Sequence, residues 1–312
     1  MKKKKILITG AAGLVGQNLI TRLKTRFDLE LICVDKHHKN CLIFRKFNPE
    51  IKLIEEDLAK SDTEFDFVKD IDIVIIIHAQ ISGLTETPFI ANNVIATQNI
   101  INASIENKIS YIIHISSSVV LSKAYDFYTQ TKIAQEKLIL ESGIPSVVLR
   151  PTLMFGWFDR KHLGWLAHFI KRSPVFPIPN FGRYLRQPLY AGDFCSVIES
   201  CIDDPKPNQI FDISGQNKVY YVDLIKLLKL STDSKSIILP IPYQLFWVLL
   251  KVYSFFSKDP PFTTQQLEAL VISEEFPIID WPDIFSVKTT PLEEAFEQVY
   301  KHGKYSKVKL EF

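Results

Sequence analysis

The sequence lacks the features of several large protein classes. Its formal net charge is only +2, with 37 Lys and Arg against 35 Asp and Glu, which argues against nucleic acid as the main partner. The four cysteines, Cys33, Cys41, Cys195 and Cys201, contain no C-x-x-C pair, so neither a zinc site nor a redox dithiol is indicated, and we expect no metal. Such cysteines are typical of small buried side chains in a reducing compartment, which favours a cytoplasmic protein.

Long hydrophobic runs are also missing. After the basic start at Lys2–Lys5, the first apolar run is Ile6–Ile8, whereas a secretory signal needs roughly 7–15 apolar residues. Two prolines interrupt the apolar stretch 237–256, and its helical part, 243–256, is too short for a bilayer, which takes about 20 residues. We therefore expect no transmembrane segment. Because this helical part is apolar nearly all round, we expect it to be buried in the protein or in an oligomer; the alternative is that it covers a partner or a membrane surface.

The first half of the chain alternates between two hydrophobic periodicities. Short β-branched runs are separated by longer amphipathic stretches, an order that predicts an α/β Rossmann fold: a doubly wound parallel sheet with helices on both faces. The predicted strands are Lys5–Thr9, Leu29–Asp35, Ile51–Glu55, Ile71–His78, Tyr111–Ser116 and Ser146–Arg150. The predicted helices include Gly13–Phe27, Ala91–Asn107 and Tyr128–Ser142.

The second half has a different character. From about Pro151 prolines become frequent and the alternation becomes irregular, which predicts a smaller, loop-rich lobe. We therefore predict a dinucleotide-binding Rossmann domain over 1–150 and a mainly substrate-binding lobe over 151–312, with a return strand near 209–213. In this lobe Thr290 to Glu293 predicts a helix start, with Thr as cap, Pro at the first position and Glu closing a capping box.

A glycine-rich turn, Gly10-x-x-Gly13-x-x-Gly16, joins the first predicted strand to the first helix. Gly10 permits the tight turn, Gly13 lets a pyrophosphate approach the backbone, and Gly16 lets the helix pack closely on the strand. Asp35 follows at the end of the next strand, as the dinucleotide fingerprint requires. Its carboxylate would accept hydrogen bonds from the adenosine ribose and repel a 2′-phosphate, which favours NAD over NADP. The basic segment 36–39 would soften that repulsion, and His37-His38 is interpreted as part of a solvated loop.

A second motif, Tyr128-x-x-x-Lys132, places two side chains on one face of a predicted helix. The charge of Lys132 would lower the pKa of the phenol from its usual value of about 10, so that Tyr128 acts as a general acid/base, and Lys132 would also hold the nicotinamide ribose. The preceding strand ends in the run Ser116-Ser117-Ser118, at the sheet edge where ligands bind. One of these serines would hydrogen-bond the substrate oxygen on which Tyr128 acts.

These features occur with further short motifs over most of the chain. Together they resemble the extended short-chain dehydrogenase/reductase family, in its NAD-dependent nucleotide-sugar epimerase/dehydratase branch. The matching segments are Thr9-Gly10-x-x-Gly13-x-x-Gly16, Asp57-Leu58, His78-Ala79, Asn92-Asn93-Val94 with Thr97 and Asn99, Ser116-Ser117, Tyr128-x-x-x-Lys132, Leu149-Arg150-Pro151 and Arg186-Gln187-Pro188-Leu189-Tyr190-Ala191-Gly192-Asp193.

The resemblance implies roles for individual residues. It implies that Ser117 contacts the substrate and completes a catalytic set with Tyr128 and Lys132, and that Arg186 holds the substrate diphosphate. It implies a homodimer formed through the helices at 91–107 and 128–142. His78 and His114 are interpreted as structural strand residues. Asp57 and Leu58 are implied to lie at the adenine, and Asn93 near the active-site helix. The full set of residues implied to bind the dinucleotide is Gly10, Gly13, Leu14, Val15, Gly16, Asp35, Asp57, Leu58, Ala79, Asn93, Tyr128, Lys132 and Pro151.

The resemblance further implies an NAD(P)-dependent enzyme acting on a nucleotide-linked sugar by hydride transfer at C4, in polysaccharide biosynthesis. A 4-epimerase is favoured, and a 4-keto-sugar reductase stays open. Dehydration is disfavoured, because no acidic residue follows Ser117 directly. A non-catalytic dinucleotide-binding subunit is a further alternative, since 237–285 resembles atypical family members of that sort, but the intact Ser117, Tyr128 and Lys132 argue against it. Arg186 argues against a reductase of non-sugar substrates.

Overall fold

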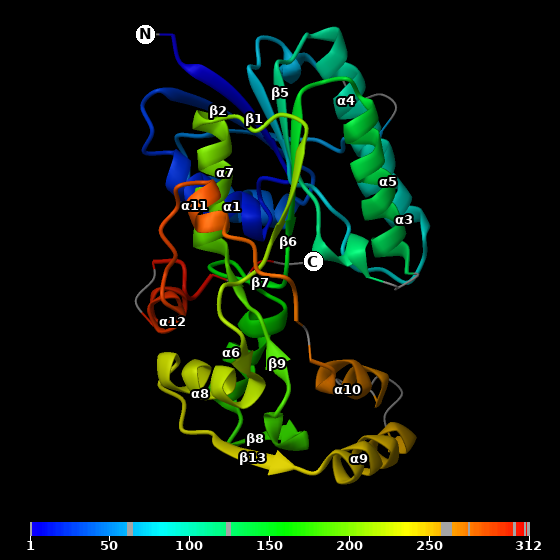
Figure 1. The fold of residues 1–312 in the computed structure, drawn as a ribbon, viewed down its shortest axis with the longest axis vertical. Coiled ribbons are helices and arrows are strands. Elements are labelled where there is room, and N and C mark those ends of the chain that lie inside the picture. The colour runs from blue at the N-terminus through cyan, green and yellow to red at the C-terminus, as the bar shows by residue number, and fades with distance from the viewer. Residues whose placement is uncertain are drawn as a thin grey trace.

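A seven-stranded parallel sheet forms the centre of the molecule, in the order β11-β6-β5-β4-β1-β2-β3 (Figure 1). The computed structural model describes residues 2–60, 65–122, 126–256, 264–273, 275–301, 304–308 and 310. The strands are β1 (Lys4–Thr9), β2 (Leu29–Asp35), β3 (Lys52–Glu55), β4 (Ile73–Ile76), β5 (Tyr111–Ile115), β6 (Ser146–Pro151) and β11 (Gln209–Ile213). The predicted fold class is therefore confirmed, and so is the return strand at 209–213.

Helices cover both faces of this sheet (Figure 1). On one face α1 (Leu14–Leu23), α2 (His38–Phe47) and α7 (Ala191–Asp203) enclose a core that contains Ile6 and Ile8 of β1. On the other face α4 (Ala96–Glu106) and α5 (Phe127–Glu141) enclose a second core around Leu7. Consecutive residues of one strand are thus buried on opposite faces, which explains the continuous apolar runs in the sequence.

Two elements differ from the predicted ones in the first half. The solvated loop predicted at His37-His38 is only partly correct, because α2 begins at His38: His37 is its N-cap residue, and the His37 ring accepts a hydrogen bond from the Asn40 N–H. His38 lies in the first turn of α2 and pairs with Glu55 of β3 at 2.6 Å. The predicted helix 91–107 begins as a π-helical turn, η2 (Ile90–Ile95), before it continues as α4.

The later part of the chain builds a third core, in which α6, α8 and α12 pack around Phe155, Phe176 and Tyr184. β11 and α7 also come from this part of the chain, but β11 belongs to the central sheet and α7 packs on one of its faces. The domain boundary at residue 150 stays a prediction. The remaining elements are η1 (Asp66–Val68), α3 (Thr87–Phe89), η3 (Ser118–Leu121), β7 (Met154–Phe155), α6 (His162–Arg172), β8 (Val175–Pro179), η4 (Asn180–Gly182), β9 (Leu185–Arg186), β10 (Leu189–Tyr190), β12 (Val219–Tyr220), α8 (Tyr221–Ser231), β13 (Ile237–Ile241), α9 (Tyr243–Phe256), α10 (Thr264–Val271), α11 (Trp281–Ile284) and α12 (Leu292–Tyr300).

The helix start predicted at Thr290 is only partly correct. A helix does begin at Leu292, but its N-cap residue is Pro291, and no side chain caps it. The Thr290 hydroxyl and N–H instead donate to the two carboxylate oxygens of Asp193, at 2.6 and 2.9 Å. A long-range acceptor on α7 therefore outcompetes the local capping box and ties α12 to the sheet layer.

The expected burial of the apolar helix at 243–256 is wrong within this chain. None of residues 243–252 of α9 is buried. The helix packs against α10 and lies at the end of the molecule away from the sheet (Figure 1). Within the described part of the chain, no helix combines the length and apolarity needed to cross a membrane.

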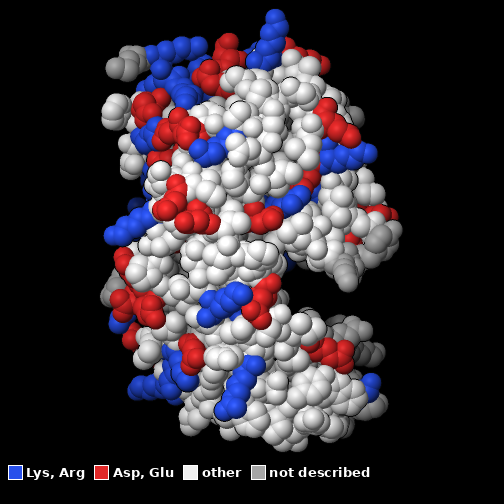
Figure 2. Space-filling view, viewed as in Figure 1, with Lys and Arg blue, Asp and Glu red and all other residues white. Residues whose placement is uncertain are grey.

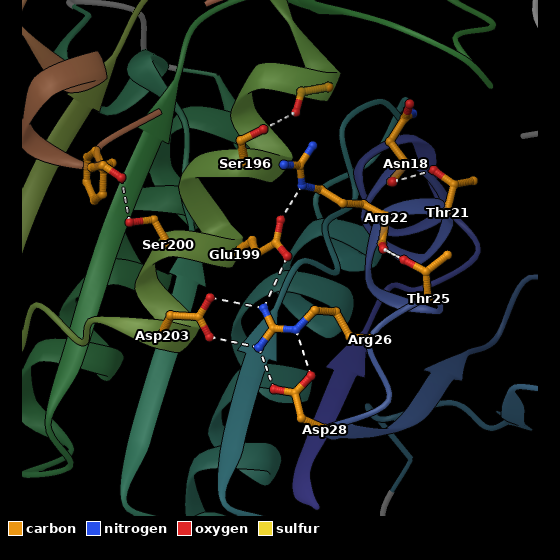
Figure 3. Close-up of polar contacts among 12 residues, drawn as sticks. Asn18, Thr21, Arg22, Thr25, Arg26, Asp28, Ser196, Glu199, Ser200 and Asp203 are labelled. Carbon is orange, nitrogen blue, oxygen red and sulfur yellow. Dashed lines mark hydrogen bonds and ion pairs between the residues drawn. The ribbon is translucent and has the colours of Figure 1, made fainter. Parts of the chain in front are cut away.

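Ion pairs connect α1 and the turn after it to α7 (Figure 3). The Arg26 guanidinium donates to Asp28 and Asp203 and also to Glu199, which in addition accepts from Arg22. The Arg26 hydrogen bond holds the pKa of Asp28 at about 2, despite some desolvation. All four cysteines are free and buried, as their interpretation as small core side chains predicted.

Candidate active site

The predicted site residues meet along one edge of the sheet. Because the strands are parallel, their carboxyl ends share that edge. The turns and helices that follow β1 to β5 therefore lie next to one another, although they are far apart in the sequence. The predicted residues placed there are Gly10 after β1, Asp35 at the end of β2, Asp57 after β3, Ala79 after β4 and Ser117 after β5.

The glycine-rich turn leaves no room for side chains where the backbone is closest. Gly10 has a φ of +68°, and a Cβ there would lie 2.6 Å from the backbone nitrogen of His78. A Cβ on Gly16 would lie 2.5 Å from the carbonyl oxygen of Ala11. Gly13 precedes α1, whose N-terminus has no side-chain cap and no acidic residue in its first turn. Such an uncapped helix start suits a pyrophosphate, so the turn fits the diphosphate of a dinucleotide.

Asp35 lies beside this turn and holds it. Its two carboxylate oxygens accept hydrogen bonds from the N–H groups of Ala12 and His37, both at 2.9 Å. Burial raises the pKa of Asp35, while these hydrogen bonds lower it. A carboxylate has about four acceptor positions, so two bonds leave capacity for ribose hydroxyls.

The neighbouring charge of Lys36 is engaged elsewhere. Its ammonium donates to the carboxylate of Asp57 at 3.0 Å and to the side-chain oxygen of Asn92 at 2.5 Å. Burial would raise the pKa of Asp57, but hydrogen bonds from the Ala59 N–H and from Lys36 lower it overall. The Lys36 charge, one of those expected in segment 36–39 to soften repulsion of a 2′-phosphate, is therefore paired with a carboxylate.

The remaining residues predicted at the dinucleotide lie around the same edge. Leu14 and Val15 form the first turn of α1, and Ala79 is exposed directly after β4 and His78. Leu58 is buried, and its carbonyl accepts a hydrogen bond from Asn99 of α4 at 2.9 Å. Pro151 ends β6 opposite Ile213 of β11.

Asn93 connects two of these segments from the π-helical turn. Its side-chain oxygen accepts from the Gln80 N–H at 2.6 Å, and its amide donates to the Gln80 carbonyl at 3.1 Å. The same amide donates to the Thr131 hydroxyl on α5 at 2.9 Å. Asn93 thus fixes the loop after β4 against the helix that carries Tyr128 and Lys132. π-Helical turns are frequent at functional sites.

The three serines after β5 have different surroundings. The Ser116 hydroxyl donates to the Glu136 carboxylate within the protein interior. Ser118 is buried at the start of η3. The Ser117 hydroxyl accepts from the Val119 N–H at 3.4 Å, and its side chain lies close enough to the Tyr128 phenol to lower the pKa of that group. Of the three, Ser117 is therefore the serine that lies at Tyr128.

The predicted effect of Lys132 on Tyr128 is wrong in this structure. Lys132 is 1% exposed, and its ammonium donates to the Ile115 carbonyl at 2.9 Å and to the Gln135 side-chain oxygen at 2.5 Å. Burial raises the pKa of Tyr128, and the neighbouring Ser117 side chain only partly offsets that rise. Burial also lowers the pKa of Lys132 to about 7, against the opposite effect of Glu136. The lysine is thus directed at β5 and its own helix.

A buried hydrogen-bonded chain continues from Lys132 towards the glycine-rich turn. The Gln135 amide donates to the Thr97 hydroxyl at 2.7 Å. Thr97 is 3.0 Å from His78 Nε2, and His78 Nδ1 is 2.7 Å from the hydroxyl of Thr9, which precedes Gly10. Burial, and then the charge of Lys132, lowers the pKa of His78 to about 3, so its ring is neutral. This supports the structural interpretation of His78. Gln135 belongs to no motif that the sequence analysis could identify.

Arg186 lies apart from these residues and is buried. Its guanidinium donates to the carbonyls of Leu185 and Ile272, both at 2.8 Å, and to that of Leu270. It also lies over the Tyr184 ring, 4.9 Å from the ring centroid. The end of α10 and the residue after it therefore supply two of its acceptors, and contact with a substrate diphosphate stays a prediction.

A cleft of about 810 Å³ lies elsewhere, along α1, α7, α11 and α12. None of the predicted site residues lines it. Arg22 and Glu199, which line it, are paired with each other (Figure 3). The convergence of the glycine-rich turn, Asn93, Ser117, Tyr128 and Lys132 therefore locates the candidate active site at the carboxyl edge of the sheet.

Comparison with known proteins agrees with this arrangement. A sequence model of the NAD dependent epimerase/dehydratase family matches residues 6–214. UDP-glucose 4-epimerase of Vibrio cholerae is 23% identical over 273 residues, covering 78% of this chain and 81% of its own. Subunit 9 of the NADH dehydrogenase [ubiquinone] 1 alpha subcomplex of Mus musculus is 26% identical over 213 residues, covering 66% of this chain and 55% of its own. The crystal structure of UDP-glucuronic acid 4-epimerase from Bacillus cereus with NAD has a TM-score of 0.68 at 21% identity, covering 86% of this chain and 99% of that one.

The chain belongs to the NAD dependent epimerase/dehydratase family. Membership confirms the predicted resemblance and makes the protein an NAD-dependent enzyme of the epimerase/dehydratase type. It also confirms NAD as the cofactor, which the uncapped helix start behind Gly13 and the carboxylate of Asp35 fit. The substrate and the reaction are a separate question.

Proposed function

We propose that the protein is a nucleotide-sugar 4-epimerase, with Tyr128 as the acid/base at the sugar O4. The observation that carries the proposal is the placement of Ser117, directly after β5, beside Tyr128 of α5, at the sheet edge that also holds the glycine-rich turn. A hydroxyl pair of this kind can hold a substrate oxygen and exchange a proton with it. The relatives named as 4-epimerases support this choice of reaction.

NAD would lie with its pyrophosphate over Gly13 and the start of α1 and its adenosine ribose at Asp35. When bound, it supplies the group that accepts and returns a hydride at C4 of the sugar. Asn93 would keep the loop after β4 in place against α5, since its side chain bonds both Gln80 and Thr131. A nucleotide diphosphate sugar is the proposed substrate, with Arg186 at the diphosphate, as the family resemblance implies.

The proton chemistry of Tyr128 also supports a second candidate, a reductase of nucleotide-linked 4-keto sugars. Burial raises the pKa of Tyr128, so the phenol holds its proton at neutral pH. A neutral phenol donates a proton to a keto oxygen, which is the step that a reductase needs. An epimerase needs the same donation and also the reverse step, for which the charge of Lys132 would have to stabilise the phenolate.

The test is Tyr128→Phe, with Ser117→Ala beside it. We expect Tyr128→Phe to lower the maximal rate on UDP-sugar substrates by about 10²–10⁴-fold, because it removes the proton-transfer group. Dinucleotide affinity, measured by calorimetry, should stay nearly unchanged, because the ring and its packing remain. Ser117→Ala should slow turnover less, since it removes a hydrogen bond and not the acid/base. Wild-type turnover by Tyr128→Phe would reject the proposed mechanism.

The same assay separates the alternatives. Interconversion of two UDP-sugars without net consumption of dinucleotide supports the epimerase, and oxidation of one NADH for each keto sugar reduced supports the reductase. Dinucleotide binding without turnover of any nucleotide sugar would favour a non-catalytic subunit, the kind of protein to which the relative from Mus musculus belongs.

We further propose a cytoplasmic homodimer that serves polysaccharide biosynthesis. Free, buried cysteines support a reducing compartment. The outer sides of α4 and α5 support a two-fold interface, because they expose large aliphatic side chains. These side chains are Ile95 just before α4, Ile105 on α4, and Ile133 and Leu140 on α5. Light scattering at micromolar concentration tests the dimer, and a monomer would reject it.

A further inference from the structure

The strand pair β8 and β13 has an unusual outer face. The two strands run parallel, with Ile237 opposite Val175 and Leu239 opposite Pro177. Ile237 and Leu239 are 64% and 47% exposed, and Val175 is 38% exposed. Their neighbours Phe176 and Ile178 point the other way, into the third core. A sheet with one buried face normally presents polar residues on its other face, and this one presents apolar residues on both.

The helix that follows β13 also exposes apolar side chains. Four of its aliphatic side chains, Leu245, Val248, Leu249 and Val252, are each 49–52% exposed. Their spacing of i, i+3, i+4 and i+7 makes one stripe along α9. Apolar stripes of this kind normally face the core, and this one faces outward. We call these four residues together with Val175, Ile237 and Leu239 the apolar end face.

The apolar end face lies at one extremity of the molecule. Figure 1 places β8, β13 and α9 together at the end opposite the sheet, and Figure 2 shows that end as mostly uncharged in this view. Single exposed apolar residues are normal on a protein surface, whereas contiguous patches mark sites of interaction with proteins or membranes. The tyrosine and tryptophan of α9, Tyr243 and Trp247, are half-buried beside the stripe. Side chains of these two types are enriched at membrane–water interfaces.

Basic residues surround this face. Residues 236–256 contain no Asp or Glu, and Lys251 is exposed within α9. Three further basic residues, Lys171, Arg172 and Lys235, are exposed. They lie together at the end where β8 and β13 begin, because the Ser234 hydroxyl donates to the Ile170 carbonyl there. Among the residues that the structure describes, the nearest acidic ones along the chain are Asp233 before β13 and Glu268 of α10 after α9. The described part of the rim therefore has more basic than acidic residues, which complements an anionic surface.

We propose that the apolar end face docks on an anionic lipid bilayer, with α9 lying in the headgroup plane. A helix of 14 residues is about 21 Å long, which is too short to span a bilayer but suits an interfacial position. A second copy of the chain is a poorer occupant. A two-fold interface brings identical patches together, so the basic rims of two copies would face and repel each other.

Vesicle flotation of the full chain tests the proposal. We expect the wild type to float with vesicles of phosphatidylcholine mixed with phosphatidylglycerol, much less with phosphatidylcholine alone, and less as salt is raised. The double variant Leu245→Gln/Leu249→Gln should lower the partition coefficient at least tenfold. Both side chains are about half exposed, so the fold should survive, and circular dichroism and the Tm check this. Leu42→Gln on α2 is the matched control, because Leu42 is also 52% exposed, and it should float like the wild type.

A charge variant, Lys171→Glu/Lys235→Glu, separates the contribution of the basic rim. It should weaken flotation with anionic vesicles and leave the low binding to neutral vesicles unchanged. Two results would overturn the proposal: no flotation of the wild type with anionic vesicles, or equal flotation of the Leu245→Gln/Leu249→Gln variant. A special case of the first is a wild type that does not bind vesicles but forms an oligomer that this variant dissociates. That case would assign the face to a second copy. None of these results depends on turnover, so the proposed reaction is tested separately.

Discussion

Replacement of Glu136 by glutamine tests the buried ion pair beneath the candidate active site. Glu136 lies on α5, one turn after Lys132, and is 5% exposed. Its carboxylate accepts from Arg150 of β6 at 2.9 and 2.7 Å and from the Ser116 hydroxyl. Glu136 therefore joins α5 to β6 and to the residue directly after β5. This contact lies next to Ser117, the serine at Tyr128.

The loss of stability can be worked out from these contacts. Glutamine keeps the shape of the side chain but removes the charge, and the remaining carboxylate near Arg150 is Asp212 at 3.5 Å, whose side chain is 41% exposed. Breaking a buried pair by removing one partner costs about 3–5 kcal/mol, because the other charge is left uncompensated. Since the amide oxygen of glutamine still accepts one hydrogen bond, we expect a loss of about 3 kcal/mol in the free energy of unfolding.

Equilibrium unfolding in urea at pH 7 measures this loss, with Asp212→Asn as the matched control. Asp212 pairs with the same guanidinium but at the surface, where ion pairs contribute about 0–1 kcal/mol. Glu136→Gln should therefore cost several times more than Asp212→Asn, with no change in the denaturant slope. Equal costs for the two variants would show that the pair does not hold α5 to the sheet, and the reasoning would fail.

Three further predictions concern charges around the same fold. Gln135→Leu removes the side-chain oxygen that accepts from Lys132, so the pKa of Lys132 should fall further, below about 7. Dinucleotide binding that needs the charged ammonium should then weaken at a lower pH than in the wild type. Calorimetric titrations over a range of pH measure this, and an unchanged pH dependence of binding would contradict it. NAD should bind more tightly than NADP, and Asp35→Asn should reduce this difference in affinity by removing the charge that repels the 2′-phosphate. Equal affinities for NAD and NADP in the wild type would show that Asp35 does not distinguish the two riboses. Arg26→Gln should reduce stability above about pH 4 and lose this effect as the pH falls towards 2, because the pKa of Asp28 is lowered to about 2 by its bond to Arg26 and the stabilisation disappears once Asp28 is protonated. Thermal unfolding of wild type and Arg26→Gln between pH 2 and 6 measures it, and a difference independent of pH would contradict it.

The strands could be predicted from the sequence because each is a short apolar run buried on both faces. β2 and β11 have the predicted bounds, and the order of runs and amphipathic stretches was sufficient for the parallel sheet. α2 was missed because its cap is the His37 ring, which is not among the favoured capping residues. The position of α9 could not be predicted. An apolar helix is expected to be covered, but its sequence does not show whether the rest of the chain, a partner or a membrane covers it.

The site could be predicted to the level of segments but not of side-chain directions. The spacing of Tyr128 and Lys132 does place both on α5, and the glycine pattern does form the turn before α1. The direction of Lys132, however, depends on the Ile115 carbonyl and on Gln135, and neither is part of a recognisable motif. The choice of Ser117 among three serines depends likewise on Glu136, which draws Ser116 inward.

Arg186 has one role implied by its sequence motif and other partners in the structure. The family resemblance places its guanidinium at a substrate diphosphate, while in the structure three carbonyl groups accept its hydrogen bonds, two of them from Leu270 and Ile272. Phosphate oxygens are stronger acceptors for a guanidinium than neutral carbonyls. A diphosphate that binds Arg186 therefore competes with the end of α10 for the same N–H groups. Under the proposed function, substrate binding and the position of α10 are then coupled, because both depend on one guanidinium.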